Sequence, residues 1–400
     1  MTDKWKIYTL AIICFLVGTS EYIIAGILDQ VALDIGVTVA AAGQLITVYS
    51  LVFAFGTPII MTLTATIDRR KMLIYSLITF IIGNVIAVAL PGFIFLIVSR
   101  IILALSTGVF VVTAMTVTSK LAPADKQGSA IATLVMGFST ALIIGVPLGR
   151  VFAASYDWKL IFGVIGLLGI IATFVVIASI PRTASEAPIP LRDQFALLLQ
   201  PKIAVAFSVT FFWIAGYSIV YTYISPYLST ITNMSSQVVS AGLFALGIAS
   251  LLGSKFGGFS VDKWGAPRTL TIGMLLHVVA LLAFSLAGQN VYLVFALLIL
   301  WSFSAWSSGP TQQYYLLTLA PGASGIMLSL NSSFIQLGMA AGAGLGGIVI
   351  QKASLSDVSW IGAIGVLIAV GAAVLSFRLS RTEQPKEAAL SVAPQQIEST

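Results

Sequence analysis

The chain has 400 residues, of which 58% are hydrophobic and 8% charged, and its formal net charge is +6. Soluble domains carry about 25% charged residues, so this composition excludes a soluble globular protein and predicts a chain surrounded by lipid. Cys14 is the only cysteine, which excludes an internal disulfide. The apolar runs are long and continuous, a pattern that favours membrane-spanning helices over the short alternating strands of a barrel.

The apolar runs predict twelve spans, most of them about 20 residues long or longer, which is enough to cross a bilayer. They are expected at 7–28, 41–63, 72–90, 94–118, 129–153, 160–180, 203–224, 238–259, 269–287, 291–315, 325–350 and 358–377. The first run follows two lysines, as a signal peptide would, but it is too long and no cleavage pattern follows it. It is interpreted as an uncleaved span.

The basic residues predict the orientation of these spans. Sixteen of the 20 lysines and arginines fall on the side of the N-terminus, whereas only Lys159 and Lys352 fall in loops on the other side. This bias predicts that both termini lie in the cytoplasm. It also accounts for the net positive charge, so no nucleic-acid binding is expected. The two remaining basic residues, Arg100 and Arg150, lie inside spans.

The longest polar break separates the sixth span from the seventh and divides the chain into equal halves. We therefore expect an N-terminal six-helix bundle at 1–181, a cytoplasmic linker at 182–200, a C-terminal six-helix bundle at 201–380 and a disordered cytoplasmic tail at 381–400. Charged loops follow the second and the eighth span, at matching places in the two halves. Such a repeat indicates an internal duplication.

At these loops the chain resembles the major facilitator superfamily, whose loop pattern is G-x-L-a-D-r-x-G-r-r. The second loop matches this pattern at Gly258, Asp262, Gly265 and Arg268. The first loop is degenerate, with Thr64 in place of the glycine before Asp68, Arg69 and Arg70. The resemblance implies two pseudo-symmetric helical bundles with a site between them near mid-membrane. The loops would act as conformational latches, in which Asp68 caps a helix or pairs with a base.

The fifth span carries GFSTALIIGVPLGR, which is similar to the motif that marks exporters of the drug:proton antiporter group within this family. The expected hinge residues of this motif are Gly137, Gly145, Pro147, Gly149 and Arg150. Small residues let helices approach closely, and the proline permits a bend. Arg150 stands where the motif has its last glycine. Near the outer end of its span, it could either face the interior or snorkel outward.

Glu21 is the one acidic residue expected inside a span, because every other Asp or Glu is placed in a loop or tail. A carboxyl at membrane depth is a functional candidate by default, since an unpaired charge there is unfavourable. Arg100 is similar to the family's fourth-span arginine and lies at about the same depth. We expect Glu21 to carry a proton, and Arg100 to stabilise its charged form or to receive substrate. The alternative is a static pair that neutralises itself.

Polar and aromatic residues inside other spans are candidates for a solute cavity. They are Gln44, Tyr49, Trp213, Tyr217, Trp306, Gln312, Asn331 and Gln336. Helix packing and interfacial belts are the competing interpretations, and the tyrosines near Pro226 are expected in such a belt. His277, the only histidine, is interpreted as a packing or interfacial residue in preference to a proton shuttle.

These features predict a proton-coupled secondary transporter that exports a small organic solute by alternating access. The solute would be a drug, a sugar, or a purine base or nucleoside. No catalytic motif, P-loop or metal-binding cluster is present, so neither an enzyme nor a cofactor is expected. The expected partners are the solute, protons and the bilayer of a bacterial inner membrane, with the protein as a monomer. A proton-coupled importer and a receptor that does not transport remain as alternatives.

Overall fold

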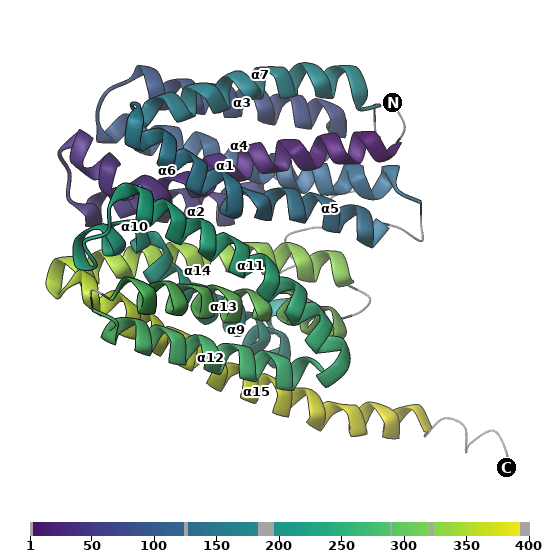
Figure 1. The fold of residues 1–400 in the computed structure, drawn as a ribbon. Coiled ribbons are helices and arrows are strands. Elements are labelled where there is room, and N and C mark those ends of the chain that lie inside the picture. Colours follow the sequence, from purple (N-terminus) through teal and green to yellow (C-terminus); the bar gives the residue numbers. More distant parts are fainter. Residues whose placement is uncertain (1–2, 124–126, 183–195, 289, 321–322, 393–400) are drawn as a thin grey trace, which may run out of the picture.

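The computed structural model describes residues 3–123, 127–182, 196–288, 290–320 and 323–392 (Figure 1). The helices of the first half are α1 (Asp3–Ile35), α2 (Val39–Leu63), α3 (Arg69–Ala89), α4 (Phe93–Leu121), α5 (Gln127–Thr140), α6 (Val146–Ser155) and α7 (Lys159–Ser179). Those of the second half are α9 (Pro201–Thr222), α10 (Ile224–Pro226), α11 (Ser236–Trp264), α12 (Ala266–Leu286), α13 (Val291–Leu319), α14 (Ser324–Lys352) and α15 (Val358–Val392).

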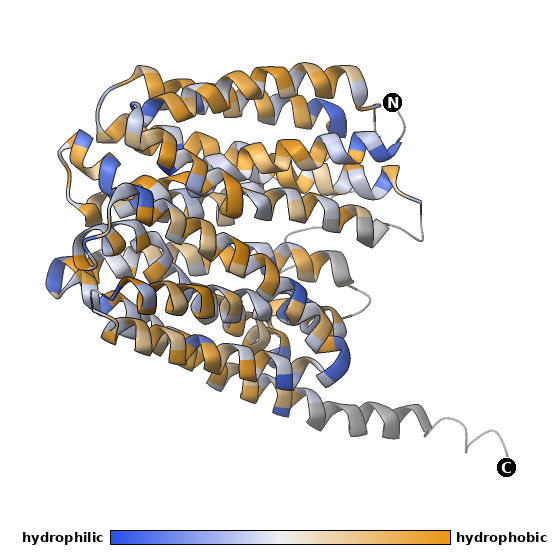
Figure 2. Cartoon of the chain, viewed as in Figure 1, coloured by the Kyte–Doolittle hydropathy of each residue, from blue (hydrophilic) through white to orange (hydrophobic). Residues whose placement is uncertain are grey.

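The predicted all-helical membrane fold is confirmed. Within the described residues, twelve helical segments are long and apolar enough to cross a membrane, and no strand is present. The fifth span consists of α5 and α6, joined by a π-helical turn at Ala141–Gly145. Figure 2 shows apolar residues along the lengths of the helices and hydrophilic residues gathered mostly near their ends. This distribution places the helix sides, but not the helix ends, against hydrocarbon.

The two halves repeat one pattern of helix packing. In the first half α3 packs on α4 and α7, α2 on α4, and α1 on α5. In the second half the corresponding helices make the corresponding contacts: α12 with α13 and α15, α11 with α13, and α9 with α14. The halves meet where α2 packs on α14 and where α6 and the π-helical turn pack on α11. Because α2 corresponds to α11, and the fifth span corresponds to α14, each of these two contacts is the counterpart of the other. The fold is therefore pseudo-symmetric.

The bundle has two ends, which we name by the chain termini. The N-terminus and the last turns of α15 lie at the end on the right of Figure 1, here the terminal end. The α10 segment lies at the other, here the opposite end. Between described residues, three hydrogen bonds join the halves: one reaches Glu21, midway along α1, and two reach the opposite end. All three of these bonds lie at Glu21 or on its opposite-end side.

Two segments differ from the sequence expectations. The second charged loop is almost entirely helical, because α11 continues to Trp264 and only Gly265 separates it from α12. Gly265 has a φ of +78°, which glycine adopts without steric strain, so one residue makes the turn. The tail expected to be disordered from residue 381 is helical as far as Val392, since α15 continues through it. Residues 183–195 of the expected linker lie outside the described residues.

Candidate functional site

Glu21 is bonded to both halves of the molecule. Its carboxylate oxygen Oε2 accepts a hydrogen bond of 3.2 Å from the hydroxyl of Tyr49 on α2. The other oxygen, Oε1, accepts one of 3.1 Å from Nε2 of Gln336, which lies on α14 in the other half. The residue is 9% exposed. All three residues are candidates in the sequence, Glu21 as a proton carrier and Tyr49 and Gln336 for a solute cavity, but only the tertiary structure joins them.

Arg100 lies next to Glu21 without forming an ion pair with it. Its Nη1 donates a hydrogen bond of 2.8 Å to the backbone carbonyl of Ser20. The guanidinium also lies over two aromatic rings, 5.8 Å from the centroid of Tyr49 and 5.1 Å from that of Phe162. Cation–π contacts of this kind hold an arginine without neutralising it. In this arrangement Glu21 and Arg100 therefore do not form the static ion pair that was the alternative.

A narrow cavity lies beside the Glu21 carboxylate and the Arg100 guanidinium. It is lined by Glu21, Tyr22, Ala25, Leu45, Ile46, Tyr49, Ser50, Arg100, Tyr221 and Met339. Its free space admits about one water molecule. In this arrangement the cavity has room for a proton carrier such as water but not for an organic solute, for which sites are usually about 300 Å³ or larger.

The aromatic candidates on α9 and α13 form one cluster inside the second half. The ring of Tyr217 stacks on Tyr221 at 5.3 Å and lies 6.2 Å from Trp306, whose Nε1 donates to the Tyr217 hydroxyl. Trp213, one turn earlier on α9, is 5% exposed, and its Nε1 has no partner. The tyrosines near Pro226 are also buried, so their expected place in an interfacial belt is wrong.

The amide candidates mostly connect helices. Nε2 of Gln312 donates to the carbonyl of Ala206 and to the hydroxyl of Thr210, which in turn donates to Oδ1 of Asn331. These bonds tie α13 and α14 to α9 within the second half. Gln44 lies at the contact between α2 and α14, where its Nε2 would be 3.1 Å from a Cβ atom at Gly347. The amides of Gln44, Gln312 and Asn331 are not among the residues that line the cavity beside Glu21.

His277 is fully buried on α12 and is held by a single polar contact. Its Nε2 accepts a hydrogen bond of 2.9 Å from the indole Nε1 of Trp301, while its Nδ1 has no partner. An Nε2 that accepts from an indole N–H belongs to a neutral imidazole. This contact agrees with the packing role expected for His277 and excludes an interfacial position.

The glycines of the fifth-span motif pack directly against α1. A Cβ atom would lie 2.2 Å from the Ala11 carbonyl oxygen at Gly137, 2.3 Å from the Thr19 hydroxyl at Gly145, and 2.0 Å from Cδ1 of Ile23 at Gly149. At Gly137, where the close contact is with backbone, a larger residue would therefore force the fifth span away from α1, whereas at Gly145 and Gly149 the side chains of Thr19 and Ile23 would have to move. The π-helical turn ends at Gly145, just before Pro147, so the motif contains the irregularity of this span.

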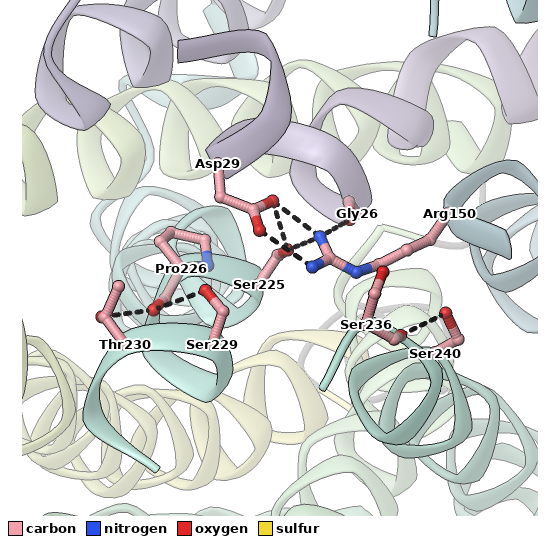
Figure 3. A network of polar contacts seen from close by, with 9 residues as sticks. All are labelled: Gly26, Asp29, Arg150, Ser225, Pro226, Ser229, Thr230, Ser236 and Ser240. Carbon is pink, nitrogen blue, oxygen red and sulfur yellow. Dashed lines mark hydrogen bonds and ion pairs between the residues drawn. The ribbon is translucent and has the colours of Figure 1, made fainter. Parts of the chain in front are cut away.

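Arg150 is buried and paired, and its expected alternative of snorkelling outward is wrong. The residue is 2% exposed, and its guanidinium holds Asp29 in a bidentate ion pair with N–O distances of 2.6 and 2.8 Å. Nη1 also donates to the carbonyl of Gly26 and to the hydroxyl of Ser225 (Figure 3). The backbone of α1 is non-helical at Ile27, between the carbonyl that Arg150 bonds and Asp29. The inserted arginine accounts for this kink.

Asp29 corrects the expectation that Glu21 is the one acid inside a span. The helix α1 continues to Ile35, so Asp29 lies within it, about 12 Å beyond Glu21 along the axis. The run of apolar residues breaks at Asp29 in the sequence, although Val31 and Ala32 continue the buried face. A buried arginine on another span needs a counter-ion, and this need was the available signal for Asp29. No sequence signal identified Ser225.

The two latch loops differ in structure. Asp68 caps α3 by accepting a hydrogen bond from the backbone N–H of Lys71, and Arg70 donates to the carbonyl of Ile177 on α7. Arg69 is buried, and its Nε and Nη1 atoms have no partner. In the second loop Asp262 lies inside α11 and caps no helix, whereas Gly258 and Arg268 lie at open positions. Among the described residues, no cluster of acidic, histidine and cysteine side chains could hold a metal ion.

Comparison with known proteins agrees with this architecture. A family model described as Major Facilitator Superfamily matches residues 10–325 and 205–399. The Uncharacterized MFS-type transporter YbcL of Bacillus subtilis (strain 168) is 54% identical over 97% of this chain and 98% of its own length. The Inner membrane transport protein YdhP of Escherichia coli (strain K12) is 30% identical over 96% of this chain and 98% of its own.

Two solved structures share the fold at low sequence identity. One is a bacterial homolog to the human lysosomal transporter Spinster, in an inward-facing and unoccupied conformation. It has a TM-score of 0.78 and 15% identity and covers 94% of this chain and 97% of its own. The other is the nucleoside transporter NupG (D323A mutant), with a TM-score of 0.75 and 14% identity, covering 94% of this chain and 100% of its own. At such identities the likeness concerns the fold alone.

Proposed function

Because the chain belongs to the Major Facilitator Superfamily, and is therefore a multi-pass membrane transporter and not an enzyme, we propose that it is a proton-coupled exporter of a small organic solute. Its place would be a bacterial inner membrane, with the terminal end in the cytoplasm, as the distribution of basic residues indicates. Glu21 would carry the proton. Transport would follow from alternation between two arrangements of the halves.

The observation that carries this proposal is the pair of hydrogen bonds on the Glu21 carboxylate. Tyr49 supplies one donor from the first half and Gln336 supplies the other from the second half, at 3.2 and 3.1 Å. An ionised carboxylate accepts hydrogen bonds only, whereas a protonated carboxyl must also donate one. A proton that binds Oε1 would therefore change the bond that crosses between the halves, because this oxygen would then carry a donor facing Gln336.

Gln336 is suited to respond to that change. Its Oε1 atom is buried and has no hydrogen-bond partner in this arrangement. Protonation of Glu21 would supply a donor, which Oε1 could accept after rotation of the side-chain amide by half a turn. The two protonation states of Glu21 would thus favour two different geometries of the contact between α1 and α14, which is the coupling that an antiporter needs.

Arg100 supports the same cycle from the first half. Its guanidinium lines the cavity with Glu21, yet its polar bond goes to the Ser20 carbonyl. A positive charge that is close but not bonded stabilises ionised Glu21 without competing for its oxygens. It also leaves N–H groups of Arg100 available to a solute in another arrangement of the halves.

The direction of transport rests on two features. The fifth-span glycines resemble the exporter motif, and they pack on α1, the helix that holds Glu21. Between described residues, hydrogen bonds join the halves at Glu21 and at the opposite end, and closure of the opposite end suits a state that receives solute from the terminal, cytoplasmic side. The narrow cavity beside Glu21 supports a proton site, with the solute bound elsewhere between the halves.

The test uses the full-length protein in liposomes under an imposed pH gradient. Four probes cover the proposed solute classes: ethidium, arabinose, adenine and inosine. We expect at least one probe to move against its gradient in a proton-dependent manner. Glu21→Gln should abolish this accumulation but retain exchange of the same probe without a gradient. Asp157→Asn, at an exposed loop acid, serves as the matched control.

The outcomes separate the alternatives. Gradient-driven accumulation by the Glu21→Gln protein would contradict the role of Glu21. Proton-dependent movement in the direction of the proton flux would indicate an importer. Binding of a probe without any exchange across the bilayer, for all four probes, would favour a receptor that does not transport.

A further inference from the structure

The contact of Asp29, Arg150 and Ser225, here the closure contact, is divided unequally between the halves. Arg150 on α6 and Asp29 on α1 both belong to the first half, and their bidentate pair is complete within it. The second half contributes only the hydroxyl of Ser225, which accepts a hydrogen bond from Arg150 and donates one of 2.9 Å to Asp29. The ion pair can therefore persist while the serine leaves.

The chemistry of the closure contact suits repeated breaking and reforming. Ser225 is fully buried, and both of its partners are charged, so each bond is stronger than a neutral one. A water molecule offers the same donor and acceptor as a serine hydroxyl and could replace it when the halves separate. If the ion pair itself crossed between the halves, opening would leave two charges without partners, which is far more costly.

The backbone around Ser225 presents this hydroxyl to the first half. Tyr223 ends α9 with a non-helical φ of −109° and ψ of 14°, and the chain continues as the short α10. The Tyr223 hydroxyl donates to the carbonyl of Ala343 on α14 and lies 2.1 Å from where a Cβ of Gly43 on α2 would be. The segment 223–226 therefore contacts three helices, two of them in the first half.

The arginine at this position is a departure from the motif of the fifth span, where the last residue is a glycine. A glycine at position 150 could hold neither Asp29 nor Ser225. We propose that the Asp29–Arg150 pair is a preformed receptor on the first half, and that its capture of the Ser225 hydroxyl keeps the opposite end of the transporter closed. The inference rests on the alternation between two arrangements in the proposed function. It does not depend on the solute, on the direction of transport or on proton coupling.

The experiment measures the opening of each end directly. Nitroxide labels are placed at Leu33→Cys and Lys352→Cys, two exposed positions at the opposite end in different halves. A second pair at Leu63→Cys and Lys255→Cys reports the terminal end. Both pairs are made in a Cys14→Ser background, which removes the only native cysteine. Pulsed electron paramagnetic resonance then gives the distance distributions in nanodiscs.

Ser225→Ala removes one hydroxyl and leaves the ion pair intact, so folding should be preserved. We expect the ratio of open to closed molecules at the opposite end to rise about tenfold or more, as for loss of a hydrogen bond to charged groups. The terminal-end pair should shift toward its shorter distance. Ser229→Ala is the matched control, because the Ser229 hydroxyl bonds only to the carbonyl of Pro226 in its own segment.

Two results would overturn the inference. One is a Ser225→Ala protein whose opposite-end distances match those of the native sequence while the native protein itself shows two populations. This result would contradict the role of the closure contact but would not contradict the proposed function. The other is a native protein with one unchanging distance at both ends in every condition, which would contradict alternation itself and the closure contact with it.

Discussion

Gln336 donates the hydrogen bond that joins the Glu21 carboxylate to the second half, over 3.1 Å. The bond places a titratable group of α1 in direct contact with α14, at the level where the halves meet. Glu21 lies midway along α1, and Asp29 lies two turns farther toward the opposite end. The helix α1 thus contains both carboxylates through which the described polar contacts between the halves pass.

Gln336→Leu should weaken the coupling between proton and solute. The substitution leaves ionised Glu21 without its donor from the second half, a loss of about 1.5–3 kcal/mol for a bond to a charged group. We expect the ratio of gradient-driven accumulation to gradient-free exchange to fall about tenfold in liposomes. Gln351→Leu, at an exposed position near the end of the same helix, should leave the ratio unchanged. Full coupling in Gln336→Leu would contradict the role given to this amide.

Gly149→Ala should destabilise the packing of the fifth span on α1. The added methyl group would lie 2.0 Å from Cδ1 of Ile23, and overpacking of this kind costs about 1–3 kcal/mol. Ile23→Val removes that Cδ1 atom and should recover part of the loss in the double variant. Gly258→Ala, with no atom within 4 Å of its added Cβ, is the control. The melting temperatures of Gly149→Ala, the double variant and Gly258→Ala are compared by thermal unfolding, followed through the reaction of Cys14 with a thiol-reactive fluorophore.

Asp29→Asn and Arg150→Met together should destabilise the protein by less than the sum of their separate effects. Each single change leaves the partner's charge without compensation, at a cost of about 3–5 kcal/mol for a buried pair. The lower figure applies here because the Asp29 side chain is 21% exposed. The double variant removes both charges and should show a coupling of about 2–3 kcal/mol in a double-mutant cycle. Strictly additive losses in melting experiments would show that the pair does not act as a unit.

His277→Gln should leave proton-driven transport intact, because the carbonyl oxygen of glutamine can accept the indole N–H of Trp301. His277→Leu leaves that buried N–H without a partner and should lower the free energy of unfolding by about 1–3 kcal/mol. Transport and thermal unfolding are measured on both variants. If His277→Gln lost coupling while remaining fully stable, the histidine would have to be assigned a role in proton transfer.

The membrane fold was predictable because hydropathy is a local property of the chain. Twelve apolar runs need no knowledge of their neighbours to be recognised, and backbone groups in hydrocarbon must be satisfied within each helix. Glu21, Arg100 and the fifth-span glycines were recognisable for a related reason. Each departs from the apolar pattern of its own segment, or matches a short motif within it.

The partners of these residues were decided by the tertiary structure alone. Which face of a helix meets which neighbour depends on the rotation of each helix about its axis, and apolar residues on every side of a span leave that rotation undetermined. In the sequence Gln336 is therefore one of several candidate amides, and only the packing of α14 on α2 brings it to Glu21. From the sequence, Asp29 is expected in a loop because the apolar run ends at Leu28. Only the insertion of Arg150 beside α1, with Ser225 arriving from the other half, shows why a carboxylate belongs there.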